Sequence, residues 1–228
     1  MSDPALFRLR VRFCMKGRLA LLSHLELAHA LERAVRRAGL PFAVSQGFSP
    51  HMRVAFGSAL PVGVGGTQEI FDLLLKEYVA PAKALAALQE KSVPDLMPYE
   101  AFYVEHNATA ASVCYPFSVY EAHLSSAVAR LEVPQSITVI RKKKEKELVV
   151  PDYLQSPVQV EGTLARFTLE AKPTGSLRPD VLLRECLEVS GNPASVTGIM
   201  RVAQCTTREE AEAVAKETSA KEVAAKAE

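Results

Sequence analysis

The sequence predicts an α+β protein in which two antiparallel sheets each carry helices on one face. Three observations support this prediction. Residues 7–13 alternate strictly between apolar and charged side chains, which is typical of a half-buried strand. Residues 23–38 combine a capping signal, apolar side chains at helical spacing and a terminal glycine. The second half of the chain then repeats the order of strands and helices expected for the first half.

The first expected strand, 7–13, reads FRLRVRF and places Arg8, Arg10 and Arg12 on one face. In a two-layer sandwich the helices cover one face of the sheet and leave the other open, and RNA-binding domains use that open face. The three arginines therefore predict an RNA-binding surface. The alternative is that they protect an exposed edge strand from pairing with other chains.

The first expected helix, 23–38, begins with the capping box Ser23-x-x-Glu26 and ends before Gly39. Its arginines fall on the side opposite the apolar residues. Further strands are expected at 42–45, 53–60, 69–75 and 99–105, a glycine-rich turn at 61–67, and a helix at 81–91. This β-α-β-β-(β)-α-β order is the split βαβ, or ferredoxin-like, pattern, and we assign it to a first domain at 1–106.

The second half restarts after a small-residue linker. Strands are expected at 117–123, 137–141, 147–150, 166–171 and 197–204, and helices at 125–131 and 178–189. The same element order predicts a second ferredoxin-like domain at 117–205. Residues 206–228 are rich in Ala, Glu and Lys and are expected to form a flexible or frayed-helix tail.

The charge is balanced overall but not along the chain. The first 60 residues carry nine Lys or Arg and three acids, whereas the remainder carries 18 basic and 23 acidic residues. A basic block on a neutral protein indicates a polyanionic partner, although a solvated basic face is the alternative. The expected nucleic-acid-binding residues are Arg8, Arg10, Arg12, Arg33, Arg36, Arg37 and Arg53.

Several classes of protein and site are not expected. No apolar run approaches the roughly 18 residues of a membrane helix, and the first residues do not resemble a secretory signal. The four cysteines are scattered without a C-x-x-C motif, so we expect no metal or iron–sulfur site and no cofactor. The turn at 63–66 does not match a phosphate-binding loop. We therefore expect a cytoplasmic protein without a membrane partner.

Two histidines are the candidate catalytic residues. His24 lies in the first turn of the capped helix, and His51 lies in the loop before Arg53. A helix N-terminus with two imidazoles could hold an anion or supply acid–base chemistry. Each histidine could instead serve only in capping or packing. If the loop lies near the start of the helix, a pocket is expected to be lined by Ser23, His24, Gln46, Gly47, Phe48 and His51.

The motifs at 23–26, 32–41 and 45–51 together resemble the radical-SAM-linked uncharacterised domain family, over roughly residues 6–205. Members of that family are fused to, or encoded beside, B12-binding radical-SAM proteins. The chain departs from the family pattern at Glu26, Ser49 and Met52. The resemblance implies a radical-SAM protein as partner. The tandem layout is also similar to that of CRISPR repeat-processing endoribonucleases, at the level of fold alone.

Three functions are compatible with the sequence. The first is an RNA-binding or substrate-presenting accessory protein that works with a radical-SAM enzyme in RNA modification or processing. The second is a stand-alone RNA-processing or RNA-modifying enzyme that uses His24 and His51. The third is a protein-interaction adaptor that binds no nucleic acid. We favour the first, because the basic residues concentrate on expected exposed faces while no nucleophile–base motif is present.

Overall fold

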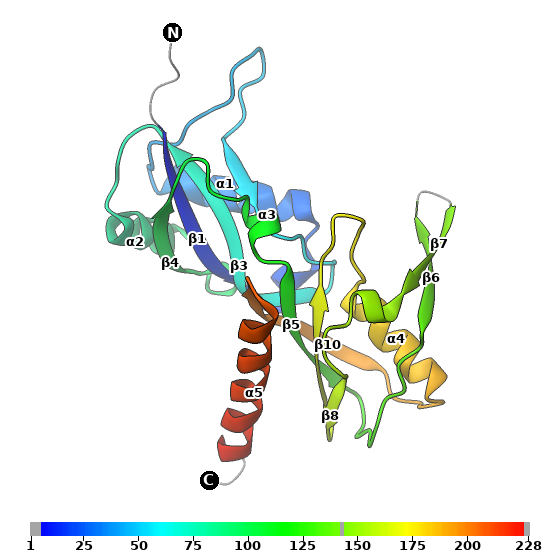
Figure 1. The fold of residues 1–228 in the computed structure, drawn as a ribbon. Coiled ribbons are helices and arrows are strands. Elements are labelled where there is room, and N and C mark those ends of the chain that lie inside the picture. Colours follow the sequence, from blue (N-terminus) through cyan, green and yellow to red (C-terminus); the bar gives the residue numbers. More distant parts are fainter. Residues whose placement is uncertain (1–5, 142–143, 226–228) are drawn as a thin grey trace. The chain divides into compact units, whose positions relative to one another are not determined.

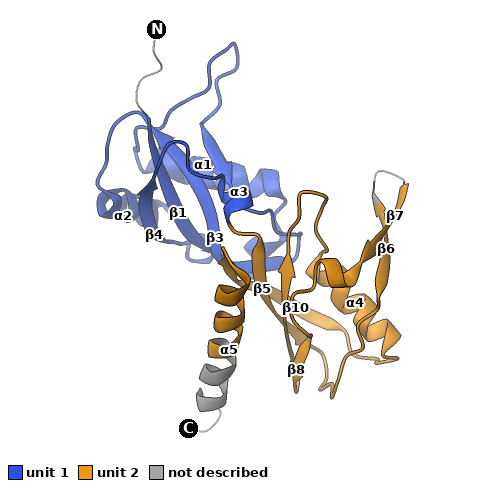
Figure 2. Cartoon of the chain, viewed as in Figure 1, with its two compact units in different colours: residues 1–114 blue, residues 115–228 orange. Residues whose placement is uncertain are grey.

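The computed structural model of the protein describes residues 6–141 and 144–225 (Figure 1). The fold is α+β, with mostly antiparallel strands and a few helices. The chain divides into two compact units, residues 1–114 and residues 115–228 (Figure 2). We call them unit 1 and unit 2.

Unit 1 contains a four-stranded antiparallel sheet in the order β4-β1-β3-β2. Its elements follow each other as β-α-β-β-α-β, with short helical turns between some of them. They are β1 (Phe7–Met15), η1 (Gly17–Leu21), α1 (His24–Arg37), β2 (Val54–Phe56), β3 (Val64–Leu75), α2 (Pro81–Lys91), η2 (Pro94–Leu96), β4 (Pro98–Val104) and α3 (Ala111–Cys114).

The core of unit 1 lies between one face of this sheet and helices α1 and α2. Leu9 and Val11 of β1 are fully buried and belong to one cluster with Leu31 of α1 and Leu88 of α2. The capping box predicted for α1 is confirmed: the Ser23 hydroxyl accepts the Glu26 N–H, and the Glu26 carboxylate accepts the Ser23 N–H. These hydrogen bonds lower the pKa of Glu26.

The segment between α1 and β3 differs from the prediction. The strand expected at 42–45 consists only of isolated bridges at Phe42 and Val44, and the strand expected at 53–60 is reduced to Val54–Phe56. The expected glycine turn is also shorter, because β3 already begins at Val64.

Unit 2 contains an antiparallel sheet in the order β10-β5-β9-β8 and a separate two-stranded sheet, β6–β7. Its elements are β5 (Phe117–Leu124), β6 (Ser136–Arg141), β7 (Lys144–Val149), η3 (Val150–Asp152), β8 (Gln159–Glu161), β9 (Leu164–Glu170), α4 (Pro179–Val189), β10 (Val196–Cys205) and α5 (Arg208–Ala225). Residues 142–143 lie outside the described residues, and β7 begins at Lys144, three residues before the strand expected at 147–150.

The helix predicted at 125–131 is wrong, since this stretch has no helical structure. Its backbone donors are used by distant carbonyl groups instead. The Ser125 N–H donates to the Ser195 oxygen, and the Val128 N–H donates to the Gly162 oxygen. Val128 is buried without the help of a helix. Contacts with distant segments therefore override the local helical spacing.

Helix α5 begins in contact with the sheet of unit 2. Ala211 is fully buried and packs with Val119 of β5 and with Ala203 and Cys205 of β10. Within residues 6–141 and 144–225, no helix is long and apolar enough to cross a membrane.

Candidate nucleic-acid interface

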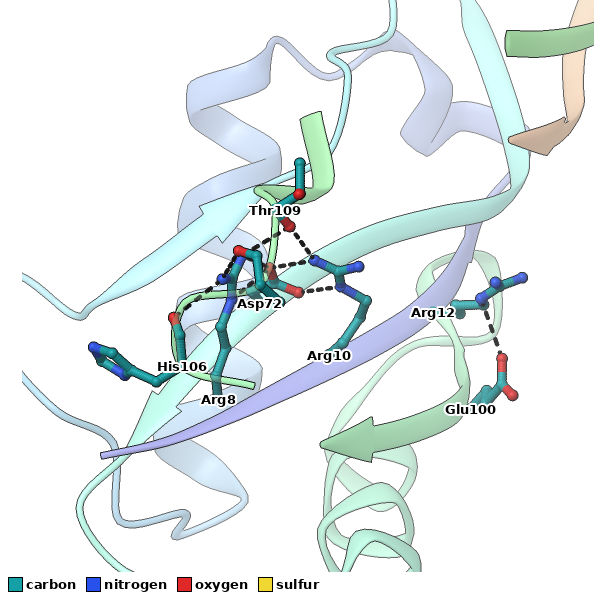
Figure 3. Close-up of polar contacts among 8 residues, drawn as sticks. Arg8, Arg10, Arg12, Asp72, Glu100, His106 and Thr109 are labelled. Carbon is teal, nitrogen blue, oxygen red and sulfur yellow. Dashed lines mark hydrogen bonds and ion pairs between the residues drawn. The ribbon is translucent and has the colours of Figure 1, made fainter. Parts of the chain in front are cut away.

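The arginines of β1 are the first predicted RNA-binding residues to consider (Figure 3). Asp72 of β3 lies opposite Arg10 in the β1–β3 register, and its carboxylate accepts four N–H groups from Arg8 and Arg10. The shortest ion-pair distances are 2.6 Å from Arg8 Nη2 and 2.7 Å from Arg10 Nε. Arg10 and Asp72 are each only 3% exposed. Two arginines therefore share one buried carboxylate.

The same two guanidinium groups also hold the chain that follows β4. Arg8 Nη1 donates to the Ala108 carbonyl oxygen at 2.5 Å, and Arg10 Nη2 donates to the Thr109 carbonyl oxygen at 3.1 Å (Figure 3). Hydrogen bonds from charged donors to backbone oxygens are among the stronger polar contacts in proteins. These hydrogen bonds therefore hold residues 106–109 against this face of the sheet.

The expectation of an open arginine face therefore does not hold for Arg8 and Arg10. Alternation in a strand shows which side chains share a face, but not what covers that face. The covering groups come from residues 62 and 99 positions away from Arg10 along the chain. Arg12 is different, because its side chain is 26% exposed and its Nε lies 3.2 Å from a carboxylate oxygen of Glu100.

A second basic region surrounds an extended loop that we call the arm, residues 44–53. The arm projects beyond the sheet of unit 1 as the blue loop next to β2 (Figure 1). The Ser45 N–H donates to the His51 carbonyl oxygen, and the Ser45 hydroxyl accepts the His51 N–H. Gly47 has φ of +120°, a conformation that favours glycine. The neighbouring Phe48 is fully exposed.

Positive charge gathers at the base of the arm. A cavity of about 590 Å³ is lined by Arg53 and Lys76, together with five uncharged residues, and by no acid. The Arg36 guanidinium carbon lies 5.0 Å from the ring centroid of Phe42, just before the arm. Arg36 belongs to the last turn of α1, where the helix dipole also favours a cation. The arm therefore combines an exposed aromatic ring with three nearby cations.

The pocket expected from Ser23, His24 and the loop is divided between two places. His24 makes an edge-on ring contact with Phe56, at 5.2 Å between centroids, and lines a cavity of only about 20 Å³. Gln46 lines the arm cavity instead, and Gly47, Phe48 and His51 belong to the arm. Among the described residues, no hydrogen bond, ion pair or ring contact joins His24 to His51.

The reason for this separation lies in the direction of α1. The helix has 14 residues, so its two ends are about 21 Å apart. His24 lies in the first turn, while the segment leading into the arm contacts Arg36 in the last turn. The arm is also tied to the end of β3, because Ala43 donates its N–H to the Leu74 carbonyl oxygen.

The remaining predicted arginines, Arg33 and Arg37, lie on another side of α1. Both line a cavity of about 460 Å³ that also includes Lys91 of α2. They are exposed, as is Arg36, whereas Arg53 is half-buried. The structure thus brings Arg36 and Arg53 to the arm, and separates them from Arg33 and Arg37.

The cysteines and acids of the described residues do not gather into a set of metal ligands. Within the described residues, no group of three or more His, Cys, Asp or Glu side chains could hold a metal ion. Cys186 and Cys205 are buried, and burial raises the pKa of Cys186 to about 11. This thiol is therefore protonated and unreactive near neutral pH.

Two residues of these surfaces, Asp72 and Lys76, were not singled out from the sequence. Asp72 carried a usable signal, since an acid within the apolar run of 69–75 is rarely buried without a charged partner. Lys76 carried no such sequence signal, because a lysine directly after a strand is common. Its importance comes only from the arm folding next to it.

The fold and these surfaces can now be compared with known proteins. No curated protein sequence matches the chain. Residues 8–179, which include the arginines of β1, helix α1 and the arm, match a family described as an uncharacterized protein conserved in bacteria (DUF2344), and the chain belongs to this family.

Proposed function

We propose that this protein is an RNA-binding accessory protein and that the arm of unit 1 binds single-stranded RNA. The observation that carries the proposal is the fully exposed ring of Phe48, which stands on the arm whose base is lined by Arg53 and Lys76. An exposed aromatic ring on a loop with cations at its base offers the stacking platform and the phosphate contacts that single-strand-binding proteins combine.

The chemistry of the arm suits single strands. Every base has a π-face, so a free aromatic ring can stack on an unpaired base whatever its sequence. Arg53, Lys76 and Arg36 would contact the phosphates on either side of that base. No carboxylate lines the cavity at the base of the arm, so nothing there repels a polyanion.

We also propose that each unit is a ferredoxin-like domain. If the separate β6–β7 hairpin is set aside, each sheet has its strands in the spatial order fourth, first, third, second, and this supports the assignment. RNA-binding domains of this class use the helix-free face of the sheet. Residues 106–109 lie over that face at Arg8 and Arg10, which is why we place the RNA on the arm instead.

The proposed partner of the accessory protein is a radical-SAM enzyme. The sequence resemblance described above supports this partner. The partner would supply the iron–sulfur cluster and the chemistry, and this chain would present the RNA. The absence of a grouped metal-ligand set among the described residues fits such a division of roles.

The arm can be tested by changing Phe48 alone. We would titrate a fluorescein-labelled 12-nucleotide single-stranded RNA of mixed sequence and record its fluorescence anisotropy. Stacking of an aromatic ring on a base contributes about 1–3 kcal/mol, so Phe48→Leu should weaken binding by about 5- to 150-fold. Phe48→Tyr retains an aromatic ring and should bind nearly as tightly as the parent.

The control is Leu25→Ala, which truncates another exposed apolar side chain of unit 1 away from the arm. It should leave RNA affinity unchanged. Equal affinity of Phe48→Leu and the parent would remove the arm from the RNA surface. A parent that binds no RNA at low salt would favour the adaptor function instead. Cleavage of the same RNA, seen on a gel, would favour the stand-alone enzyme instead.

A further inference from the structure

A second surface of unit 1 lies between α1 and the segment that joins α2 to β4. It is a groove of about 460 Å³, which we call the α1 groove. Leu19, Leu22, Val93 and Leu96 contribute an aliphatic floor. Val93 is 51% exposed, so part of this floor faces solvent.

The rim of the α1 groove is basic. His29, Arg33 and Arg37 recur every fourth residue on α1 and therefore form one row, with about 6 Å between neighbours. Arg37 Nη2 donates to the Lys91 carbonyl oxygen at 3.3 Å, which fixes the end of the row against α2. In the part of the chain that the structure describes, Arg33 has no acidic partner.

Two further groups define the polar character of the groove. Glu26 is the one acid among the lining residues, and its carboxylate is already bound to the Ser23 N–H. Ser92 also lines the groove, and its hydroxyl is shielded from solvent without a hydrogen-bond partner among the described residues.

We propose that the α1 groove binds an acidic amphipathic helix of a partner protein. An aliphatic floor accepts the apolar face of such a helix, and Arg33 and Arg37, one turn apart on α1, accept carboxylates placed at the same spacing along its flank. RNA is disfavoured, because no Phe, Tyr or Trp lines the groove and its aliphatic floor cannot stack on bases. The groove and the arm thus serve two different ligands, and this inference goes beyond the RNA-binding proposal.

The test uses the full-length protein and two labelled 18-residue peptides. Both carry leucines along one helical face; the flanking positions are glutamates in the first peptide and lysines in the second. Fluorescence anisotropy should detect binding of the glutamate peptide only. Arg33→Glu should weaken this binding by about tenfold or more, because it reverses a charge in the centre of the row. Val93→Glu should weaken it as well.

The matched control is Lys83→Glu, the same charge reversal at an exposed position of α2 outside the groove. It should bind the glutamate peptide like the parent. Thermal melts would show that all variants are folded. The inference fails if neither peptide binds, if both bind equally, or if Arg33→Glu binds like the parent.

A titration of Arg33→Glu with the RNA separates this inference from the proposed function. RNA affinity should stay close to that of the parent. If the variant loses RNA binding and the peptide does not bind the parent, the groove belongs to the RNA surface. The partner inference is then wrong while RNA binding by the protein stands.

Discussion

The arginines of β1 and the cations around the arm belong to the same unit, and all of them except Lys76 belong to the same basic block of sequence, yet their surroundings differ. Arg10 is buried against Asp72 and binds the backbone of Thr109. Arg53 and Lys76 line an open cavity at the base of the arm, and the ring of Phe48 on the same arm is fully exposed. Burial with a carboxylate makes a cation structural, whereas exposure beside an aromatic ring leaves it free to bind a ligand.

Unit 2 contains the counterpart of the β1 pair with the charges exchanged. Glu121 of β5 lies opposite Arg166 of β9, and the two groups are 2.8 Å apart. In each unit, the first and third strands of its main sheet in chain order thus share a cross-strand ion pair. The ion pairs of Asp72, Glu121 and Glu100 decrease in burial in this order. Neutralising each carboxylate in turn tests whether a more buried ion pair contributes more to stability.

The largest effect is expected for Asp72→Asn. The change leaves two arginines, one of them buried, without a counter-charge, and removal of one partner from a buried ion pair costs about 3–5 kcal/mol. Urea denaturation should show this loss in the free energy of unfolding. A variant as stable as the parent would mean that Arg8 and Arg10 are solvated, contrary to the structure.

A smaller loss is expected for Glu121→Gln in unit 2. The side chain of Glu121 is 15% exposed, and Glu161 lies 3.5 Å from Arg166 as a second counter-charge. We expect a cost of about 1.5–3 kcal/mol, the range for a hydrogen bond to a charged group. Urea denaturation again measures the free energy of unfolding. A larger loss for Glu121→Gln than for Asp72→Asn would contradict the proposed link between burial and stability.

The smallest effect on stability is expected for Glu100→Gln. This carboxylate pairs with Arg12 at 3.2 Å, but its side chain is 51% exposed and that of Arg12 is 26% exposed. Exposed ion pairs contribute about 0–1 kcal/mol, because water and salt screen them. Destabilisation well beyond 1 kcal/mol, measured by the same method, would show that Arg12 has a structural role like Arg8 and Arg10.

These contrasts also show what the sequence can reveal. The strand at 7–13 and the helix at 23–38 were predictable, because alternation and the capping box are local patterns. The absence of a helix at 125–131 was not, since its backbone donors bond to Ser195 and Gly162, far away in sequence. Local spacing cannot describe such distant partners.

The candidate site was predictable in part for the same reason. The basic block and Phe48 were recognised from the sequence, and Arg36 and Arg53 do lie at the arm. The burial of Arg8 and Arg10 depends on Asp72 and on residues 106–109, which no local pattern connects to β1. The division of His24 from His51 depends on which end of α1 each segment reaches.

The most direct test of the account is the salt dependence of RNA binding in two matched double variants. Arg53→Gln/Lys76→Gln removes two cations at the arm, and Arg12→Gln/Lys16→Gln removes two in or directly after β1. Each lost phosphate contact on a single strand should flatten the slope of log affinity against log salt by roughly 0.7. The account predicts a slope flatter by about 1.4 for the arm variant and an unchanged slope for the β1 variant. An unchanged slope for the arm variant, or a flatter slope for the β1 variant alone, would contradict it.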